Sequence, residues 1–196
     1  EETRAVIAAR LASLCKGYSG VSVSLLEGIV RFLDEGILPL IPSEGSVGAS
    51  GDLTPLSYLA AALCGEREVL HNGVQVPARE ALRNANITPL KLRPKEGLAL
   101  MNGTAVMTGL ACLAWHRASY LARLTTRITA MASFALDGNA RHFDEILFSV
   151  KPHTGMQKVA EWLRNDLVCD AQDERNGKRL QDRYSIRCAP HVIGVL

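Results

Sequence analysis

The sequence predicts a mainly α fold, a long-helix bundle core that carries one small β-hairpin. Three observations favour this class. Hydrophobic residues make up 47% of the chain and aromatic residues only 5%, while Ala and Leu are abundant, as is typical of closely packed helices. Residues 104–137 contain no proline and only one glycine, Gly109. An Asn72-Gly73 pair between two β-rich runs predicts the hairpin.

Two helical patterns occupy the first part of the chain. Residues 2–15 predict a helix that ends at Gly17, because glycine suits the left-handed position that follows a helix. Ser24 and Glu27 have the spacing of a capping box, so a second helix is expected from there towards Gly36. Prolines then interrupt the pattern.

A loop of small residues comes next and leads into a third helix. Residues 48–51 are all small, and glycines on either side let the backbone fold back on itself at little steric cost. The side chain of Asp52 or Thr54 can accept hydrogen bonds from the unpaired N–H groups of a helix start, and Pro55 suits the first turn. The alanine-rich helix is expected to end at Gly65.

The remaining elements follow in order along the chain. The hairpin covers residues 69–76, a short helix covers 77–83, and a connecting loop covers 84–97. The long helix follows, and at 1.5 Å per residue it is on the order of 50 Å long. Further helices are expected over 143–150 and 156–167, then a polar, charged loop over 170–180, and residues 181–190 lead into a last helix.

The long helix has an alternative interpretation as a transmembrane span. Residues 97–115 contain no charged residue, which a span of this length requires. Asn102 and Thr108 interrupt the apolar run, however, and Arg117 and Arg123 follow on the same helix. Because polar groups inside a membrane are costly, the pattern favours a core helix of a soluble bundle.

Composition and the chain ends limit the other function classes. A net charge of +2 without a basic run argues against a nucleic-acid partner. Five scattered cysteines without a CxxC pair argue against a disulfide framework and favour the reducing cytoplasm. The chain starts in a helical pattern without methionine and stops within an apolar run. We therefore expect one helical domain over residues 1–196, the central fragment of a longer protein.

The small-residue loop has several interpretations when it is taken alone. Glycines ahead of a helix occur in phosphate-binding loops, but the required spacings are absent, and Asp52 would place a carboxylate where the phosphate sits. A hydrolase nucleophile at Ser50 would need glycine instead of Asp52. On this segment alone, an ordinary Gly/Ser turn is the simplest interpretation.

Three segments together resemble the histidine/phenylalanine/tyrosine ammonia-lyase family. They are GSVGASGDLTPL at residues 45–56, KEGLALMNGT at residues 95–104 and QDRYSIRC at residues 181–188. The resemblance implies a larger all-α lyase fold of which this chain is the central part. It also implies a 4-methylidene-imidazol-5-one group (MIO), formed autocatalytically from Ala49-Ser50-Gly51.

The residue types of this tripeptide suit such a cyclisation. The nitrogen of Gly51 must attack the carbonyl carbon of Ala49, which needs a compressed turn and little steric crowding. Ser50 carries the hydroxyl whose elimination leaves an exocyclic methylidene. Ordinary side chains are nucleophiles, acids or bases, so covalent capture of a substrate amine needs an electrophile that the chain itself makes.

The resemblance also assigns roles to residues outside the tripeptide. Asn102 would lie near the MIO and the substrate amine or carboxylate, with capping of the long helix as an equal alternative. Arg187 would pair with the substrate carboxylate, although most arginines are simply at the surface. Tyr184 would stand beside the MIO, with plain packing as its alternative. Gln181 would be a supporting amide, and Leu53 would line the pocket or pack in the core.

The function implied by the resemblance is elimination of ammonia from an aromatic L-amino acid, with histidine converted to urocanate as the expected reaction. Phenylalanine/tyrosine ammonia-lyases and 2,3-aminomutases share these motifs and stay open as alternatives, as does an inert helical core whose loop is uncyclised. A cytoplasmic homotetramer with sites built from several subunits is expected, with no nucleic-acid or membrane partner. The five histidines have no metal-ligand spacing, so no metal is expected.

Overall fold

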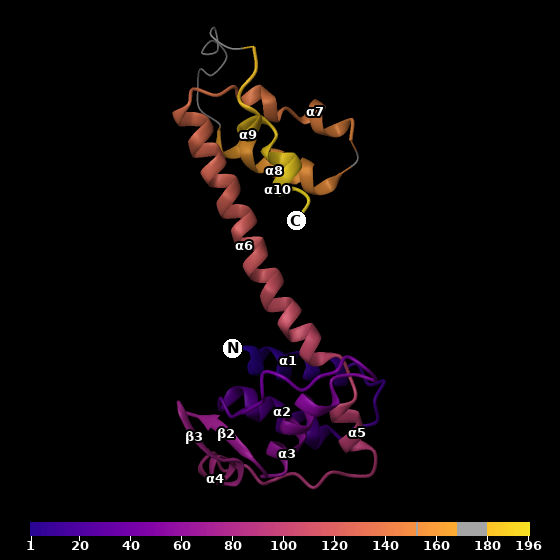
Figure 1. The fold of residues 1–196 in the computed structure, drawn as a ribbon. Coiled ribbons are helices and arrows are strands. Elements are labelled where there is room, and N and C mark those ends of the chain that lie inside the picture. Colours follow the sequence, from indigo (N-terminus) through magenta and orange to yellow (C-terminus); the bar gives the residue numbers. More distant parts are fainter. Residues whose placement is uncertain (152, 168–179) are drawn as a thin grey trace. The chain divides into compact units, whose positions relative to one another are not determined.

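The computed structural model describes residues 1–151, 153–167 and 180–196. Its contacts divide the chain into two compact units, residues 1–114 and 115–196. Helices make up most of both units (Figure 1), so the predicted mainly α class is confirmed. The expectation of a single domain over residues 1–196 stays a prediction.

The helices of the first unit are α1 (Glu2–Leu14), α2 (Val23–Asp34), α3 (Leu53–Leu63), α4 (Ala78–Asn84), α5 (Glu96–Met101) and the start of α6 (Ala105–Ala135). They follow the expected order except for α5, which begins inside the expected loop over residues 84–97 and was not predicted. Gly17 and Gly36 follow α1 and α2 with φ angles of 77° and 64°, as expected of residues that end helices.

The start of α2 differs from the capping-box prediction. The helix begins after Ser22 rather than Ser24, and no side chain caps it. Instead, the backbone N–H of Ser22 donates to the Oε1 atom of Glu96 at 2.8 Å. A carboxylate from another helix therefore fixes the start of α2, and the local Ser24–Glu27 spacing does not decide it.

A small antiparallel sheet flanks these helices. Its strands are β1 (Leu38–Pro39), β2 (Glu68–His71) and β3 (Val74–Pro77), in the order β1-β2-β3. Asn72 and Gly73 have φ angles of 53° and 79°, as a type I′ turn requires, so the predicted hairpin is confirmed. The local pattern does not predict β1, which is two residues long and contains a proline. Such a residue is tolerated at the edge of a sheet.

The core of the first unit places the site. Apolar side chains from α1 to α5 and β2 are buried together, and burial of each large one contributes about 1.5–3 kcal/mol. The largest are Ile7, Leu14, Leu25, Ile29, Phe32, Ile37, Leu59, Leu63, Leu82 and Leu100. Within this core α3 packs against α5. A backbone hydrogen bond from Asp52 to Gly103 places the residue before α3 beside the residues after α5.

The second unit contains the rest of α6 and a set of short helices. They are η1 (Ala140–Phe143, a 3-10 helix), α7 (Glu145–Ser149), α8 (Thr154–Asp166), α9 (Tyr184–Arg187) and α10 (Ala189–Ile193). Phe143, Val159, Leu163 and Ile193 form the centre of its core. The polar loop expected over residues 170–180 lies outside the described residues except for Leu180.

The predicted long helix is confirmed as α6, which has 31 residues. Ala105 is buried at its start with Val6 and Leu56. The stretch Glu96–Ala135 is long and apolar enough to cross a membrane by length and composition alone, a test that core helices of soluble proteins also pass. Only 17% of its most apolar 18-residue segment is buried among the described residues. The exposed apolar side chains include Leu110, Trp115, Leu121, Leu124, Ile128 and Met131.

Candidate active site

The loop that holds Ala49-Ser50-Gly51 lies directly before α3 in the first unit. The φ angles of Gly48, Ser50 and Gly51 are 67°, 55° and 90°. Positive φ is uncommon for a residue with a side chain, and such strain is frequent at functional sites. Ala49 and Ser50 are exposed. The tripeptide is therefore a tight turn that is open to other molecules.

Asn102 joins the end of α5 to this turn. Its Nδ2 atom donates a hydrogen bond to the carbonyl oxygen of Ser50. Thr104, two residues further on, precedes α6, so the sequence also allows Asn102 to cap α6. The carboxylate of Asp52 caps α6 instead. The Asn102 amide donates to Ser50.

Asp52 ties three segments together around the turn. One carboxylate oxygen, Oδ2, accepts from the backbone N–H groups of Val106 and Met107 at 3.1 and 3.2 Å. The other, Oδ1, accepts from the hydroxyl of Ser46 at 2.7 Å. The sequence predicts that Asp52 or Thr54 caps α3, but no side chain caps α3. The unpaired N–H groups of α6 receive the carboxylate, where negative charge is also favoured by the helix dipole.

Gly51 allows the loop to approach the Asn102–Gly103 peptide closely. The backbone N–H of Asp52 donates to the carbonyl oxygen of Gly103 at 2.7 Å. A Cβ atom on Gly51 would lie 2.8 Å from the nitrogen and 2.9 Å from the oxygen of Gly103. No side chain fits there. The tight turn and the unsubstituted Gly51 fit the steric needs of the MIO that the resemblance implies.

Arg10 lies behind this peptide and is a residue that motif comparison misses. Only 4% of Arg10 is exposed, and its Nη2 atom donates to the carbonyl oxygens of Ala99 and Asn102, the latter at 3.2 Å. Burial lowers the pKa of the Arg10 guanidinium from its ordinary value. The signal in the sequence is its spacing: Arg10 falls three residues after Ile7 and four before Leu14, on the apolar face of α1.

Leu53 is the first residue of α3 and is half-buried. It is absent from the buried core clusters of the first unit. The wall role that the resemblance assigns to Leu53 stays a prediction.

The other predicted site residues belong to the second unit. Tyr184 and Arg187 lie one turn apart on α9, with the Arg187 Cζ atom 5.4 Å from the centre of the Tyr184 ring. Tyr184 is 69% exposed and Gln181 is also exposed. Arg187 Nη1 contacts the sulfur of Cys188 at 3.5 Å, and its buried Nε has no hydrogen-bond partner among the described residues. An arginine and a tyrosine thus share one face of a short helix.

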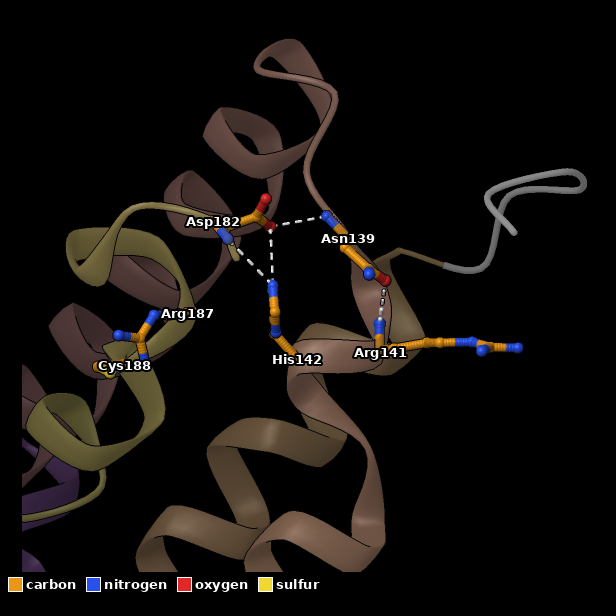
Figure 2. Close-up of polar contacts among 6 residues, drawn as sticks. All are labelled: Asn139, Arg141, His142, Asp182, Arg187 and Cys188. Carbon is orange, nitrogen blue, oxygen red and sulfur yellow. Dashed lines mark hydrogen bonds and ion pairs between the residues drawn. The ribbon is translucent and has the colours of Figure 1, made fainter. Parts of the chain in front are cut away.

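A polar cluster holds the segment that enters α9 (Figure 2). The backbone N–H of Asp182 donates to Nε2 of His142 at 3.1 Å, and its Oδ2 accepts from the backbone N–H of Asn139 at 2.7 Å. Nε2 of His142 also lies 3.8 Å from the Oδ2 atom of Asp182. Asn139 in turn caps η1 through the N–H of Arg141 at 3.0 Å. The resemblance assigns no role to His142 or Asp182.

The structure therefore forms two groups of predicted site residues. Ser50, Gly51 and Asn102 contact one another or one another's neighbours in the first unit, and Tyr184 and Arg187 do so in the second. Among the described residues, no group of three His, Cys, Asp or Glu side chains is placed to hold a metal ion.

Comparison with known proteins gives the same family. A family model described as aromatic amino acid lyase matches residues 1–196. Histidine ammonia-lyase from Geobacillus kaustophilus (strain HTA426) is 45% identical over 192 residues, which are 97% of this chain and 38% of the relative. Tyrosine 2,3-aminomutase from Myxococcus sp. (strain Mx-B0) is 41% identical over an alignment of 216 positions, which covers 100% of this chain and 41% of the relative.

A solved structure of phenylalanine ammonia-lyase from Rhodosporidium toruloides is 38% identical, with a TM-score of 0.82. The match covers 99% of this chain and 30% of that one. The chain thus spans less than half the length of these relatives. Because the family model matches the whole length of this chain, the chain belongs to the aromatic amino acid lyase family.

Proposed function

We propose that this chain forms the electrophile-bearing part of a cytoplasmic aromatic amino acid ammonia-lyase, with histidine as the substrate and urocanate as the product. The observation that carries the proposal is the tight Ala49-Ser50-Gly51 turn held by Asn102 and Gly103. A strained φ angle at Ser50 and a glycine at position 51 that leaves no room for a side chain are an unusual set of constraints for an exposed loop. We infer that these constraints hold the tripeptide in the conformation that cyclises to an MIO.

The tripeptide would hold the MIO, which supplies an electrophilic carbon that no ordinary side chain offers. Asn102 keeps a hydrogen-bond donor on the carbonyl oxygen of Ser50, where it stabilises negative charge. Asp52 fixes the loop to the first turn of α6, so the donor and the oxygen stay in register. Gly51 leaves its nitrogen sterically accessible to Ala49.

The second unit supplies groups that suit an amino-acid substrate. The guanidinium of Arg187 offers several donors in one plane, which matches the geometry of a carboxylate. Tyr184, exposed and one turn away, presents a hydroxyl that can hold the substrate amine or relay a proton. Gln181 adds an amide at the same segment, and Leu53 contributes apolar surface in the first unit.

The proposal includes a homotetramer with active sites built from several subunits. The exposed apolar side chains along α6 support assembly, because a soluble protein seldom leaves such a stripe uncovered. We place this face against other parts of the whole enzyme and against no membrane or nucleic acid. By itself the chain would be inactive.

A second candidate is a 2,3-aminomutase, favoured by the 41% identity with tyrosine 2,3-aminomutase over the whole chain. The 45% identity with a histidine ammonia-lyase favours the first candidate. Incubation of the full-length protein with histidine, phenylalanine or tyrosine separates them. We expect an ultraviolet absorbance that grows with histidine, as a conjugated acid forms. Accumulation of a β-amino acid from tyrosine would support the aminomutase. No product from any of the three amino acids would contradict both candidates.

A further inference from the structure

Arg10 occupies a position where a charged side chain is costly. It lies in the middle of α1 on the face that carries Ile7 and Leu14, both completely or almost completely buried, and it is itself 4% exposed. A buried cation is tolerated only where hydrogen bonds replace its hydration. What Arg10 bonds to therefore indicates why it is there.

Its partners are the backbone groups at the end of α5. Nη2 donates to the carbonyl oxygens of Ala99 and Asn102, which lie in the last turn of the helix and just beyond it. Such carbonyls lack partners within a helix, and a cation near them is favoured. The guanidinium thus fixes the point at which the chain leaves α5. Asn102 also holds Ser50 through its side chain.

Arg10, Gly103 and Gly51 are stacked in that order. A Cβ atom on Gly103 would lie 2.9 Å from Cζ of Arg10 and closer still to Nη1. On the other side, a Cβ atom on Gly51 would lie 2.8 Å from the nitrogen of Gly103. The Asn102–Gly103 peptide therefore contacts the planar guanidinium of Arg10, which is held by its hydrogen bonds to Ala99 and Asn102, as well as the turn that carries the tripeptide.

We propose that Arg10 is a positioning residue for the cyclisation of Ala49-Ser50-Gly51, acting through the Asn102–Gly103 peptide. This inference rests on the proposed function. Arg10 backs the peptide, and the peptide limits how far Gly51 can move away from Ala49. Without Arg10 the end of α5 can shift, and the turn can relax to a longer separation between the reacting atoms.

The cyclisation itself is balanced and needs no oxidant. The nitrogen of Gly51 bonds to the carbonyl carbon of Ala49, and that oxygen leaves as water with the N–H protons of Gly51 and Ser50. A second water leaves with the hydroxyl of Ser50 and its Cα proton, which forms the methylidene. Only the first bond requires two backbone atoms to be pressed together, so the effect of Arg10 is expected on the rate of maturation.

The test measures maturation in the full-length protein by mass spectrometry. Arg10→Met keeps an apolar stem and removes the donors, and Arg10→Lys keeps the charge but not the planar pair of donors. Leu14→Ala is the matched control, because it leaves a cavity in the core on the same helix without touching the loop. The fraction of peptide that has lost two waters is followed with time after synthesis, beside the melting temperature of each variant.

We expect maturation of Arg10→Met to slow by on the order of tenfold to a hundredfold, with Arg10→Lys intermediate. Leu14→Ala should mature at the wild-type rate despite a lower melting temperature. Wild-type maturation in Arg10→Met, or equal slowing in Leu14→Ala, would overturn the role of Arg10. If Arg10→Met does not accumulate in soluble form, wild-type maturation of Arg10→Lys would overturn it. A wild-type protein that never loses water would instead overturn the proposed function.

Discussion

The side-chain amide of Asn102 donates a hydrogen bond to the carbonyl oxygen of Ser50. This contact joins the residue that ends α5 to the centre of the tripeptide before α3, and a neutral donor at that oxygen stabilises negative charge there. Asn102→Ala removes the donor. We predict that kcat of the whole enzyme falls on the order of 10²-fold while the melting temperature changes little. Wild-type kcat in this variant would contradict the assignment.

Asp52 is predicted to matter for stability through a helix that it does not belong to. Asp52→Ala leaves the N–H groups of Val106 and Met107 without their carboxylate and frees Ser46. We expect the free energy of unfolding to fall by about 2 kcal/mol, as for loss of a strong helix cap. Urea unfolding measures this change. Asp34→Ala, at an exposed position at the end of α2, is the control and should stay within about 0.5 kcal/mol of wild type.

Glu96 is predicted to make the first unit sensitive to acid. It is 3% exposed and accepts hydrogen bonds from the backbone N–H groups of Arg93 at 2.7 Å and Ser22 at 2.8 Å. These bonds lower the pKa of Glu96 below its ordinary value of 4.5. The folded-state pKa lies below the unfolded one, so the stabilisation is complete above about pH 4.5 and is lost as the pH falls through the folded-state pKa.

Glu96→Gln checks this sign. The variant should be less stable than wild type at pH 7, because the amide cannot accept from both N–H groups as the carboxylate does. The difference in free energy of unfolding between the two proteins should shrink below pH 4.5. A difference that is constant from pH 7 to pH 3 would show that ionisation of Glu96 contributes nothing.

Asp182 is predicted to position α9 through His142 and Asn139. Asp182→Ala removes the acceptor for the N–H of Asn139, and we expect the segment that carries Tyr184 and Arg187 to shift. In the whole enzyme kcat/KM should fall about tenfold or more, because small misplacements of positioning groups slow reactions strongly. Glu161→Gln, which removes only an exposed pair with Lys158, should leave kcat/KM unchanged. Equal effects of the two substitutions would remove the basis for this prediction.

Local chemistry predicts the elements whose ends are decided by neighbouring residues. Asn72 and Gly73 require a tight turn wherever they occur between two strands, and Gly17 and Gly36 end helices by their own backbone freedom. The long α6 follows from the absence of proline and of glycine runs. The motif matches predict the tripeptide and Asn102 because they extend over many residues.

The features that the sequence does not predict depend on partners far along the chain. Asp52 caps α6 instead of α3, because the partner N–H groups come from residues 106 and 107. Ser22 starts α2 because Glu96 accepts its N–H. The residues next to Arg10 in the sequence do not predict that it donates to Asn102. Those next to Asp182 do not predict its hydrogen bond to His142. Such contacts require the packing of α1, α3 and α5, or of η1 and α9, to be known first.

The mass of the peptide that contains residues 49–51, taken from the full-length protein, shows whether Ala49-Ser50-Gly51 has cyclised. We expect this peptide to be lighter than its sequence requires by two water molecules, and the same peptide from a Ser50→Ala variant to have its full mass. A full mass in the wild-type protein would show that the tripeptide forms no MIO.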